Sequence, residues 1–259
     1  MKSTSTVTQV SSASHQDAEY QVVNQLPSNF RSYKFKSIMV RGQYYIEALA
    51  VARYIGKLEN EIDYPQLASI YSDIIKVSAS EGADFNIMDL ELLDFTTLVS
   101  ISSILTFPKF SWNPKVPCSN EDCDQIITSP PINLDEFDFY PPSVTLVDNL
   151  KLNGVAIHPV RLRDKVERAN YEAQHPDAKL LGLPIPSHVL TLAEMIDGDD
   201  FEDRVNKIAF MTRAQVEQLE QVRDDLELRV KEFVRECPKC HTKVKFSVGL
   251  QRLIVFPSV

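Results

Sequence analysis

The chain has 259 residues, of which 44% are hydrophobic and 24% charged, and its formal net charge is −9 at pH 7. This length and apolar content suffice to bury at least one sizeable core in one or two domains. The acidic balance argues against broad, non-specific binding to nucleic acid or to anionic membranes, because both depend on an excess of Lys and Arg. No apolar run approaches the roughly 20 residues that a membrane-spanning helix needs.

Residues 1–25 form the first predicted segment, which is rich in Ser and Thr and has no apolar stretch of the kind found in a secretory signal. Such a composition buries too little apolar surface to order itself. We therefore expect a flexible arm, which either stays loose, as chain termini commonly do, or becomes ordered on a partner.

A strand plus helical domain is predicted over residues 26–110. The sequence LPSNF indicates a turn, and the strand that follows includes Ile38 and Val40. The spacing of apolar residues then predicts three helices, in residues 42–56, 63–80 and 85–107.

The second and third of these helices carry the clearest local signals. Asp63 is the expected N-cap of the second helix, and Pro65 falls in its first turn, where a missing N–H is tolerated. Its apolar face is predicted to run on to Ile75. The third helix has one broad apolar face that extends from Leu90 to Leu105.

Prolines then accumulate, and they favour extended chain over helix. Residues 143–234 are predicted to form a hairpin-and-helix insertion. The hairpin turns near Asn153-Gly154, and the helices follow in two or three pieces. Thr212 and Gln215 fit a capping box.

The last helical piece carries an apolar seam: Val216, Leu219, Val222, Leu226, Val230 and Phe233. The seam is shorter than the three to four heptads that indicate a coiled coil. We therefore favour a helix packed on its own domain over an exposed coiled coil.

Four cysteines lie in two pairs, Cys118 with Cys123 and Cys237 with Cys240. With no signal peptide, paired thiols favour metal binding over disulfides. Each pair is followed by a polar residue or two and then an extended apolar segment, which is how the two halves of a zinc ribbon are built. We predict that residues 111–142 and 235–259 form one split zinc-ribbon-like module. Four thiolates leave no open coordination position, so the zinc would be structural.

The alternative is that these are four ordinary thiols without metal. His241 could replace one cysteine as a ligand, but it is more simply a solvated neighbour of Cys240. His158 and His188 are interpreted as satisfied structural histidines.

Catalytic signals are weak. Glycine is scarce, and neither a nucleotide-binding glycine pattern nor a nucleophile or metalloprotease motif occurs. We predict no catalytic residues and no enzymatic activity. Asp197 to Asp203 form an acidic cluster, which we interpret as a favourable helix start rather than an ion site. A hydrolase built on this cluster is the least favoured hypothesis, and it would lose its activity on Asp200→Ala.

Basic residues gather around the second cysteine pair: Arg235, Lys239, Lys243, Lys245 and Arg252, interleaved with Phe246 and Phe256. The simpler interpretation is a solvated basic face, but a nucleic-acid-binding zinc-ribbon protein is the alternative function. The apolar ending LQRLIVFPSV either pairs within the ribbon sheet or offers an edge to a partner.

The order of these elements resembles the small baseplate hub and hub-assembly proteins of T4-like contractile-tailed phages. The resemblance rests on the LPS turn, the MDLELLDF segment, Trp112 before the first cysteine pair, INLDEFDF, the hairpin, IDGDDFEDR and CPKCH. It covers roughly residues 26–259. It implies a cysteine-rich ribbon interrupted by an insertion, and it assigns a role, as metal ligands, to the four cysteines only.

The predicted fold class is thus α+β: a helical N-terminal region plus a zinc-ribbon-like β module interrupted by the insertion. The resemblance implies a non-enzymatic protein of the tail baseplate, either a structural hub component or an assembly factor. Its partners would be other hub and tail proteins, with nucleic acid not expected. It would reside in the virion after assembly in the host cytoplasm, and its oligomeric state is left open.

Overall fold

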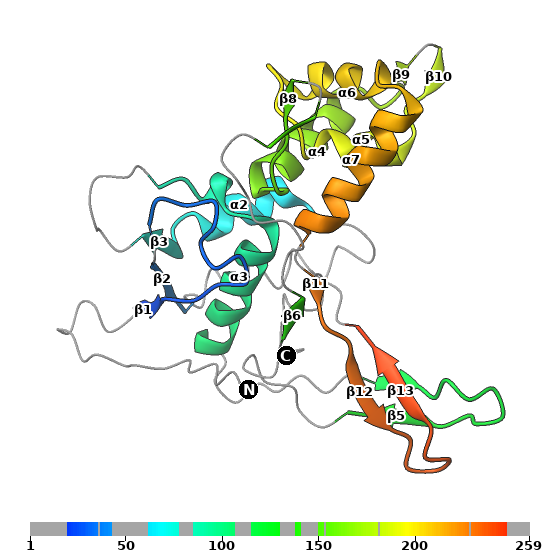
Figure 1. Cartoon of the computed structure of the whole chain (residues 1–259). Coiled ribbons are helices and arrows are strands. Elements are labelled where there is room, and N and C mark those ends of the chain that lie inside the picture. Colours follow the sequence, from blue (N-terminus) through cyan, green and yellow to red (C-terminus); the bar gives the residue numbers. More distant parts are fainter. Residues whose placement is uncertain are drawn as a thin grey trace.

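The computed structural model describes ten parts of the chain, residues 20–35, 37–42, 62–77, 85–106, 115–129, 138–140, 150–152, 154–180, 182–227 and 229–247. These parts combine helices with small antiparallel sheets, so the predicted α+β class is confirmed. In Figure 1 an N-terminal part, a group of helices and a projecting pair of β-hairpins can be followed by colour. The predicted helix in residues 42–56 and the apolar ending lie outside the described residues.

Within its described residues, the N-terminal part contains one three-stranded sheet, two α-helices and a 3-10 helix. Strands β1 (Tyr20–Val23), β2 (Ile38–Arg41) and β3 (Ile75–Val77) pair in that order, with antiparallel neighbours. The helices are α2 (Tyr64–Tyr71) and α3 (Leu92–Thr106), and the short 3-10 helix η1 (Ile87–Asp89) precedes α3.

Helix α2 begins as predicted but ends early. The Asp63 side chain accepts a hydrogen bond from the Gln66 amide at 3.0 Å, and the proline lies in the first turn. The predicted continuation to Ile75 is wrong, because Ile75 belongs to β3 and pairs with Val40 of β2. The sheet pairing outweighs the local helical spacing of apolar residues.

The predicted flexible arm is also corrected where the structure describes it. Tyr20–Val23 is strand β1, paired over four residues with β2, and Val23 is buried. Residues 1–19 lie outside the described residues.

Helix α3 runs through the N-terminal core. Leu90, just before it, and Leu98 are fully buried, whereas Leu105 near its end is 38% exposed. The helix also buries several hydroxyl groups, and these donate to backbone carbonyls one turn earlier, as Ser100 does to Thr96 at 3.0 Å. A helix surrounded by protein satisfies its polar side chains in this way.

The insertion consists of two short hairpins and four helices. The strands are β7 (Lys151–Leu152), β8 (Val155–Ala156), β9 (Lys179–Leu180) and β10 (Leu183–Pro184). The helices are α4 (Leu162–Gln174), α5 (Ser187–Ala193), α6 (Phe201–Ala209) and α7 (Arg213–Leu226). The predicted turn at Gly154 is confirmed, since Leu152 pairs with Val155 across it and Gly154 has a φ of 86°. Helix α4 and the β9–β10 hairpin were not predicted.

Helix α7 packs on its own domain, as predicted. The Thr212–Gln215 capping box forms, with the Thr212 amide 2.7 Å from the Gln215 side-chain oxygen. Leu219 and Leu226 are buried in the core of the insertion. Val216 and Val222 lie in the helix and pack against the same core, whereas the last two residues of the predicted seam, Val230 and Phe233, lie in strands beyond the helix end.

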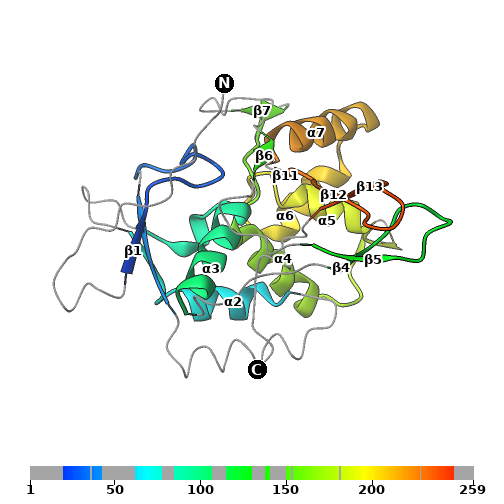
Figure 2. The same cartoon turned by 90° about the horizontal axis from the view of Figure 1, so that it is seen from below.

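The N-terminal part and the insertion are joined through the start of α4. Leu162 donates a backbone hydrogen bond to Leu90 at 2.9 Å and is fully buried in the N-terminal core. Arg31 pairs with Glu91 and also donates to the carbonyl of Leu226, the last residue of α7, at 2.8 Å. Figure 2 shows α2 and α4 next to each other on one side of this helical body, by which we mean the N-terminal part together with the insertion.

A buried carboxyl group, Asp94, holds the turn before β2 against α3. Its oxygens accept hydrogen bonds from the amide and the hydroxyl of Ser28, and its side chain is fully buried. Burial raises the pKa of Asp94 to about 7, and the charge of Glu91 acts in the same direction against the hydrogen bonds from Ser28. The folded state therefore binds this proton more tightly than the unfolded chain does.

We expect this carboxyl group to stabilise the protein least at neutral pH. Its contribution is fully present below about pH 4 and is lost as the pH rises through about 7, an effect of up to about 4 kcal/mol. Asp94→Asn removes the titration, so the variant should lose less stability between pH 5 and pH 8 in urea unfolding. The exposed Asp177→Asn serves as the control. Parallel pH profiles for the wild type and Asp94→Asn would contradict the expectation.

Candidate metal centre

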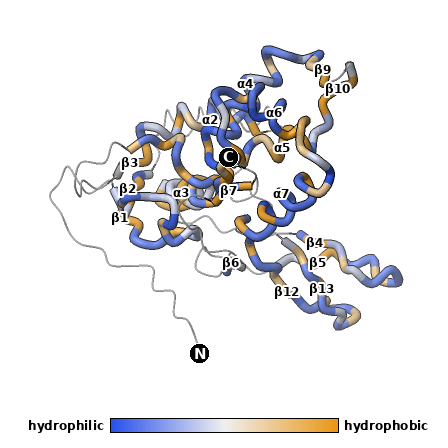
Figure 3. The backbone as a smooth tube through the Cα atoms, turned by 45° about the horizontal axis from the view of Figure 1, so that its top comes forward, coloured by the Kyte–Doolittle hydropathy of each residue, from blue (hydrophilic) through white to orange (hydrophobic). Residues whose placement is uncertain are grey.

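Two β-hairpins project together from the helical body (Figure 1). The first hairpin pairs β4 (Lys115–Pro117) with β5 (Ile126–Thr128). The second hairpin pairs β12 (Phe233–Glu236) with β13 (Lys243–Phe246). The two hairpins together are called the ribbon below, and Figure 3 shows β4, β5, β12 and β13 side by side in it.

The base of the ribbon is closed by a further pair of strands. Strand β6 (Phe139–Tyr140) pairs antiparallel with β11 (Arg229–Val230), and Lys231 donates to the carbonyl of Asp138 at 2.8 Å. The second half of the ribbon thus begins earlier than the predicted boundary at residue 235, because chain assigned to the insertion already pairs with the first half. This ladder brings the two ends of the insertion together.

The four cysteines meet where the turns of the two hairpins face each other. The Sγ atoms of Cys118 and Cys240 are 3.5 Å apart, those of Cys123 and Cys237 are 3.8 Å apart, and all four lie within 4.8 Å of one another. All four are free thiols. Tetrahedral coordination with metal–sulfur bonds of about 2.3 Å places sulfur atoms about 3.8 Å apart. The cysteine cluster therefore fits one metal ion, although four thiolates alone do not identify the metal.

The pairs have different exposure. Cys237 is fully buried and Cys123 is 7% exposed, and we call these two the inner pair. Cys118 and Cys240 are half-buried, and we call them the outer pair. Each pair takes one cysteine from each hairpin, so both pairs span the ribbon.

The turn of the first hairpin is shaped by Asn120. Its side chain accepts a hydrogen bond from the Asp122 amide at 3.1 Å, and its carbonyl accepts from the Cys123 amide at 2.9 Å. The Asn120 amide in turn favours the thiolate of Cys118, but burial and the three neighbouring thiols outweigh it and raise the pKa of Cys118 to about 12. Close thiols repel as thiolates, and a bound cation removes that repulsion.

The turn of the second hairpin needs a left-handed residue, which is His241 with a φ of 59°. This conformation lets the His241 amide donate to the Cys237 carbonyl and the Cys237 amide donate to the Thr242 carbonyl, both at 2.9 Å. The hydroxyl and the amide of Thr242 lower the pKa of Cys240 to about 6. One thiol of the cluster is thus ready to bind a cation at neutral pH.

The apolar core of the ribbon is very small. Apart from the cysteines, its buried apolar residues within the described part of the chain are Ile127, Val244 and Phe233, and Val116 packs against the first two. Phe233 and Phe246 stack at the base, with ring centroids 5.7 Å apart. A module of this size rarely folds on apolar burial alone and usually needs a metal or disulfides.

Basic residues predicted around the second cysteine pair help to join the two hairpins. Arg235 donates to the Ser129 hydroxyl at 3.1 Å, and Lys239 Nζ lies 2.6 Å from Asp124 Oδ1. That contact lowers the pKa of Asp124 and raises the pKa of Lys239. Neither Ser129 nor Asp124 was predicted. Arg252 and Phe256 lie outside the described residues.

The three histidines considered in the sequence analysis lie in different surroundings. The His241 side chain is 76% exposed and its Nδ1 lies 2.7 Å from Glu236, so the prediction of a solvated neighbour is confirmed. His158 is a satisfied structural residue, since its ring nitrogens contact the Pro159 carbonyl and Arg161. His188 is exposed on α5, which contradicts its predicted structural role.

The acidic cluster starts a helix, as predicted. Asp200 is the N-cap of α6 and accepts from the Asp203 amide at 2.8 Å. Asp203 pairs with Lys207, and Asp197 turns toward His158. Among the described residues, the four cysteines are the one group of three or more candidate ligands that converge on a single point.

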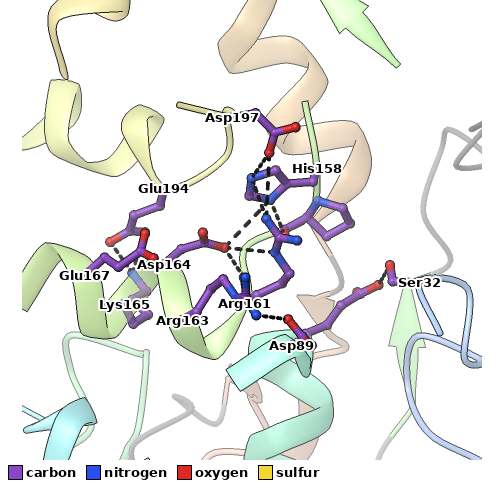
Figure 4. Close-up of polar contacts among 12 residues, drawn as sticks. Ser32, Asp89, His158, Arg161, Arg163, Asp164, Lys165, Glu167, Glu194 and Asp197 are labelled. Carbon is purple, nitrogen blue, oxygen red and sulfur yellow. Dashed lines mark hydrogen bonds and ion pairs between the residues drawn. The ribbon is translucent and has the colours of Figure 1, made fainter. Parts of the chain in front are cut away.

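A buried network of ions, which sequence reasoning missed, lies at the start of α4 (Figure 4). Asp164 is fully buried and accepts from Arg204 at 3.0 Å and from the Arg161 amide at 2.7 Å. Glu194, also fully buried, accepts from Lys165 at 2.9 and 2.7 Å. The spacing of Asp164 after Arg161 fits a helix start, but nothing in the sequence pairs it with a residue 40 positions later.

Burial lowers the pKa of His158 in this network, and the charge of Arg161 acts in the same direction, while Asp164 opposes both. The histidine is therefore held near its neutral form between charged neighbours. This arrangement is a structural one, since the acidic groups are occupied by basic side chains.

Comparisons with protein-family models, with curated proteins and with solved structures find no match to this chain. The resemblance to baseplate hub proteins therefore stays a prediction. None of the described helices has the length and apolar character needed to cross a membrane.

Proposed function

We propose that the cysteine cluster is a structural zinc site and that the protein acts through protein–protein contacts in the hub of a phage tail baseplate. The observation that supports the zinc site is the convergence of four thiol sulfurs within 4.8 Å. Zinc is the usual occupant of closed four-cysteine sites, and its binding contributes directly to folding.

The role in protein contacts rests on the shape of the molecule and on the order of its sequence elements. The ribbon projects from the helical body, and its chain returns to the body through the β6–β11 ladder. A metal ion bound by the four cysteines would stiffen this surface rather than form a reaction centre, because no coordination position is open to a substrate. The proposal that the partners are hub and tail proteins rests on the resemblance in the order of sequence elements.

Nucleic-acid binding is less well supported. Two of the basic residues around the second cysteine pair are engaged within the ribbon, Arg235 with Ser129 and Lys239 with Asp124. Lys243 and Lys245 point to solvent, but Lys245 lies 4.0 Å from Glu232. Charge already neutralised within the protein is not available to phosphates.

We expect the zinc-loaded protein to bind hub or tail proteins encoded by the same phage genome. Each candidate would be co-expressed with the tagged chain, and stable complexes would be identified by affinity purification followed by size-exclusion chromatography. Failure of every hub and tail protein to co-purify would contradict the proposal.

Duplex DNA and single-stranded RNA titrations between about 50 and 200 mM salt test the alternative. Under the proposal binding is absent at the higher salt. Tight binding that falls steeply with salt and is lost in a Lys243→Ser, Lys245→Ser variant would instead favour the nucleic-acid-binding function.

A further inference from the structure

We infer that the cysteine cluster is also a site of oxidative modification, in which hydrogen peroxide converts the metal clip into two disulfides that span the ribbon, Cys118–Cys240 and Cys123–Cys237. This inference rests on the same site as the proposed function. It goes beyond it by assigning a second, covalent state with a defined connectivity.

The connectivity follows from the sulfur positions. Four cysteines allow three pairings. The sulfur pairs that lie within 4.0 Å in hydrogen-bonding geometry are the outer pair at 3.5 Å and the inner pair at 3.8 Å, and each joins one hairpin to the other. A disulfide of about 2.0 Å requires the outer pair to approach by about 1.5 Å. Pairing within each turn, Cys118 with Cys123 and Cys237 with Cys240, would instead leave the hairpins unconnected.

The order of oxidation follows from exposure. The outer pair is half-buried and accessible to a small oxidant, whereas Cys237 is fully buried and Cys123 is 7% exposed. Oxidation of the outer pair removes two of the four thiolates, and the remaining two cannot hold a closed tetrahedral site. The metal then leaves, and the inner pair oxidises second.

The chemistry balances with hydrogen peroxide as the oxidant. One thiolate sulfur attacks a peroxide oxygen, which breaks the O–O bond and gives a sulfenic acid and hydroxide. The sulfur of the partner cysteine attacks the sulfenic sulfur, forms the S–S bond and releases a second hydroxide. Two protons convert the hydroxides to water, so each disulfide consumes one peroxide and two thiolates.

The other contacts between the hairpins keep the sulfurs in place during this exchange. Arg235 still reaches Ser129 and Lys239 still reaches Asp124, because neither contact involves the metal. The base ladder between β6 and β11 is also independent of the cluster. Once the outer disulfide has formed, it joins the two hairpins covalently, so the ribbon stays closed after the metal leaves.

Disulfide mapping of the wild-type protein tests the inference, and the sequence makes the map unambiguous. Trypsin cleaves after Lys239, between the two cysteines of the second hairpin, and a glutamate-specific protease cleaves after Glu121, between those of the first. The protein is oxidised with a limiting amount of peroxide, alkylated and digested without reduction. We expect fragment 116–121 linked to fragment 240–243 first, and the Cys123–Cys237 link at higher peroxide.

Pairing within either hairpin, the crossed pairing of Cys118 with Cys237, or oxidation to sulfinic acid without a link would each overturn the inference. A His241→Asn variant, which keeps all four cysteines and a residue suited to the left-handed turn, should still form the first link, whereas Cys240→Ser should not. Zinc is measured on the same sample before oxidation. Absence of zinc with the expected disulfide map would defeat the zinc proposal alone, and bound zinc with a different map would defeat this inference alone.

Discussion

Replacing Cys237 by Ser is expected to remove the metal and to unfold the ribbon, while the helical body stays folded. Cys237 is fully buried, and the hydroxyl that replaces its thiol is a far weaker ligand for a thiolate-binding metal. Structural zinc sites supply about 10–16 kcal/mol of apparent binding free energy in small domains. The few apolar side chains of the ribbon cannot replace such a contribution.

The measurement is metal content per chain on protein purified without chelator, combined with hydrogen exchange resolved by segment. The wild type should hold about one zinc ion, with slow exchange in β5 and β12 that a chelator abolishes. The Cys237→Ser variant should hold almost none and exchange fast in both strands. His241→Asn is the matched control, since this side chain is 76% exposed and lies outside the cluster, and Asn also adopts the left-handed conformation of the turn. Equal metal content and equal protection in the cysteine variant would contradict the structural role.

Asp164→Ala is expected to destabilise the helical body by about 3 to 5 kcal/mol. The substitution leaves Arg204, whose side chain is 7% exposed, without its buried partner, and it removes the acceptor for the Arg161 amide at the start of α4. The buried guanidinium then keeps only the partly exposed Glu167 as a counter-ion, which compensates its burial poorly, and the lost cap adds to the effect.

Glu167→Ala supplies the matched control, because Glu167 binds the same guanidinium but is 40% exposed. Its loss should cost less than about 1 kcal/mol. Denaturant unfolding of both variants, with Arg204→Leu and the Asp164→Ala, Arg204→Leu double variant, measures the coupling. We expect Arg204→Leu to restore part of the stability lost in Asp164→Ala. Similar small losses in both carboxylate variants would show that the buried pair is not coupled.

The part of the fold that local signals specify was predictable. Asp63 is the N-cap of α2, Thr212 and Gln215 form a capping box at the start of α7, and Gly154 lies in the turn of the β7–β8 hairpin. Each of these features is determined by a few neighbouring residues. These features depend on backbone groups next to the side chain that satisfies them. The sequence alone is then sufficient.

The parts of the fold that depend on partners far away in the sequence could not be predicted. Ile75 continues a helical pattern but is drawn into β3 by pairing with β2. Tyr20–Val23 follows a polar arm, and only β2 makes it a strand. Helix α4 has few apolar residues, and its buried Asp164 pairs with Arg204 of α6, 40 positions later.

In the candidate metal site, too, features set by local sequence could be predicted, and features set by distant partners could not. The two cysteine pairs could be joined into one cluster because thiol spacing is a strong chemical signal, even across an insertion. Asn120 and Thr242 shape the two turns, and they could have been suspected because Asn120 lies between Cys118 and Cys123 and Thr242 comes two residues after Cys240. Ser129 and Asp124 could not, because each meets a basic residue of the other hairpin.

The separation of the two halves of the ribbon also affects synthesis of the chain. Cys123 and Cys237 are 114 positions apart. At about 5 to 20 residues per second, the second thiol is added to the chain roughly 6 to 23 seconds before the third. During that interval the first hairpin has half of a metal site and very little core. A nascent chain that stops within the insertion never closes the cluster, so a bound metal ion marks a chain that has been translated through Cys240.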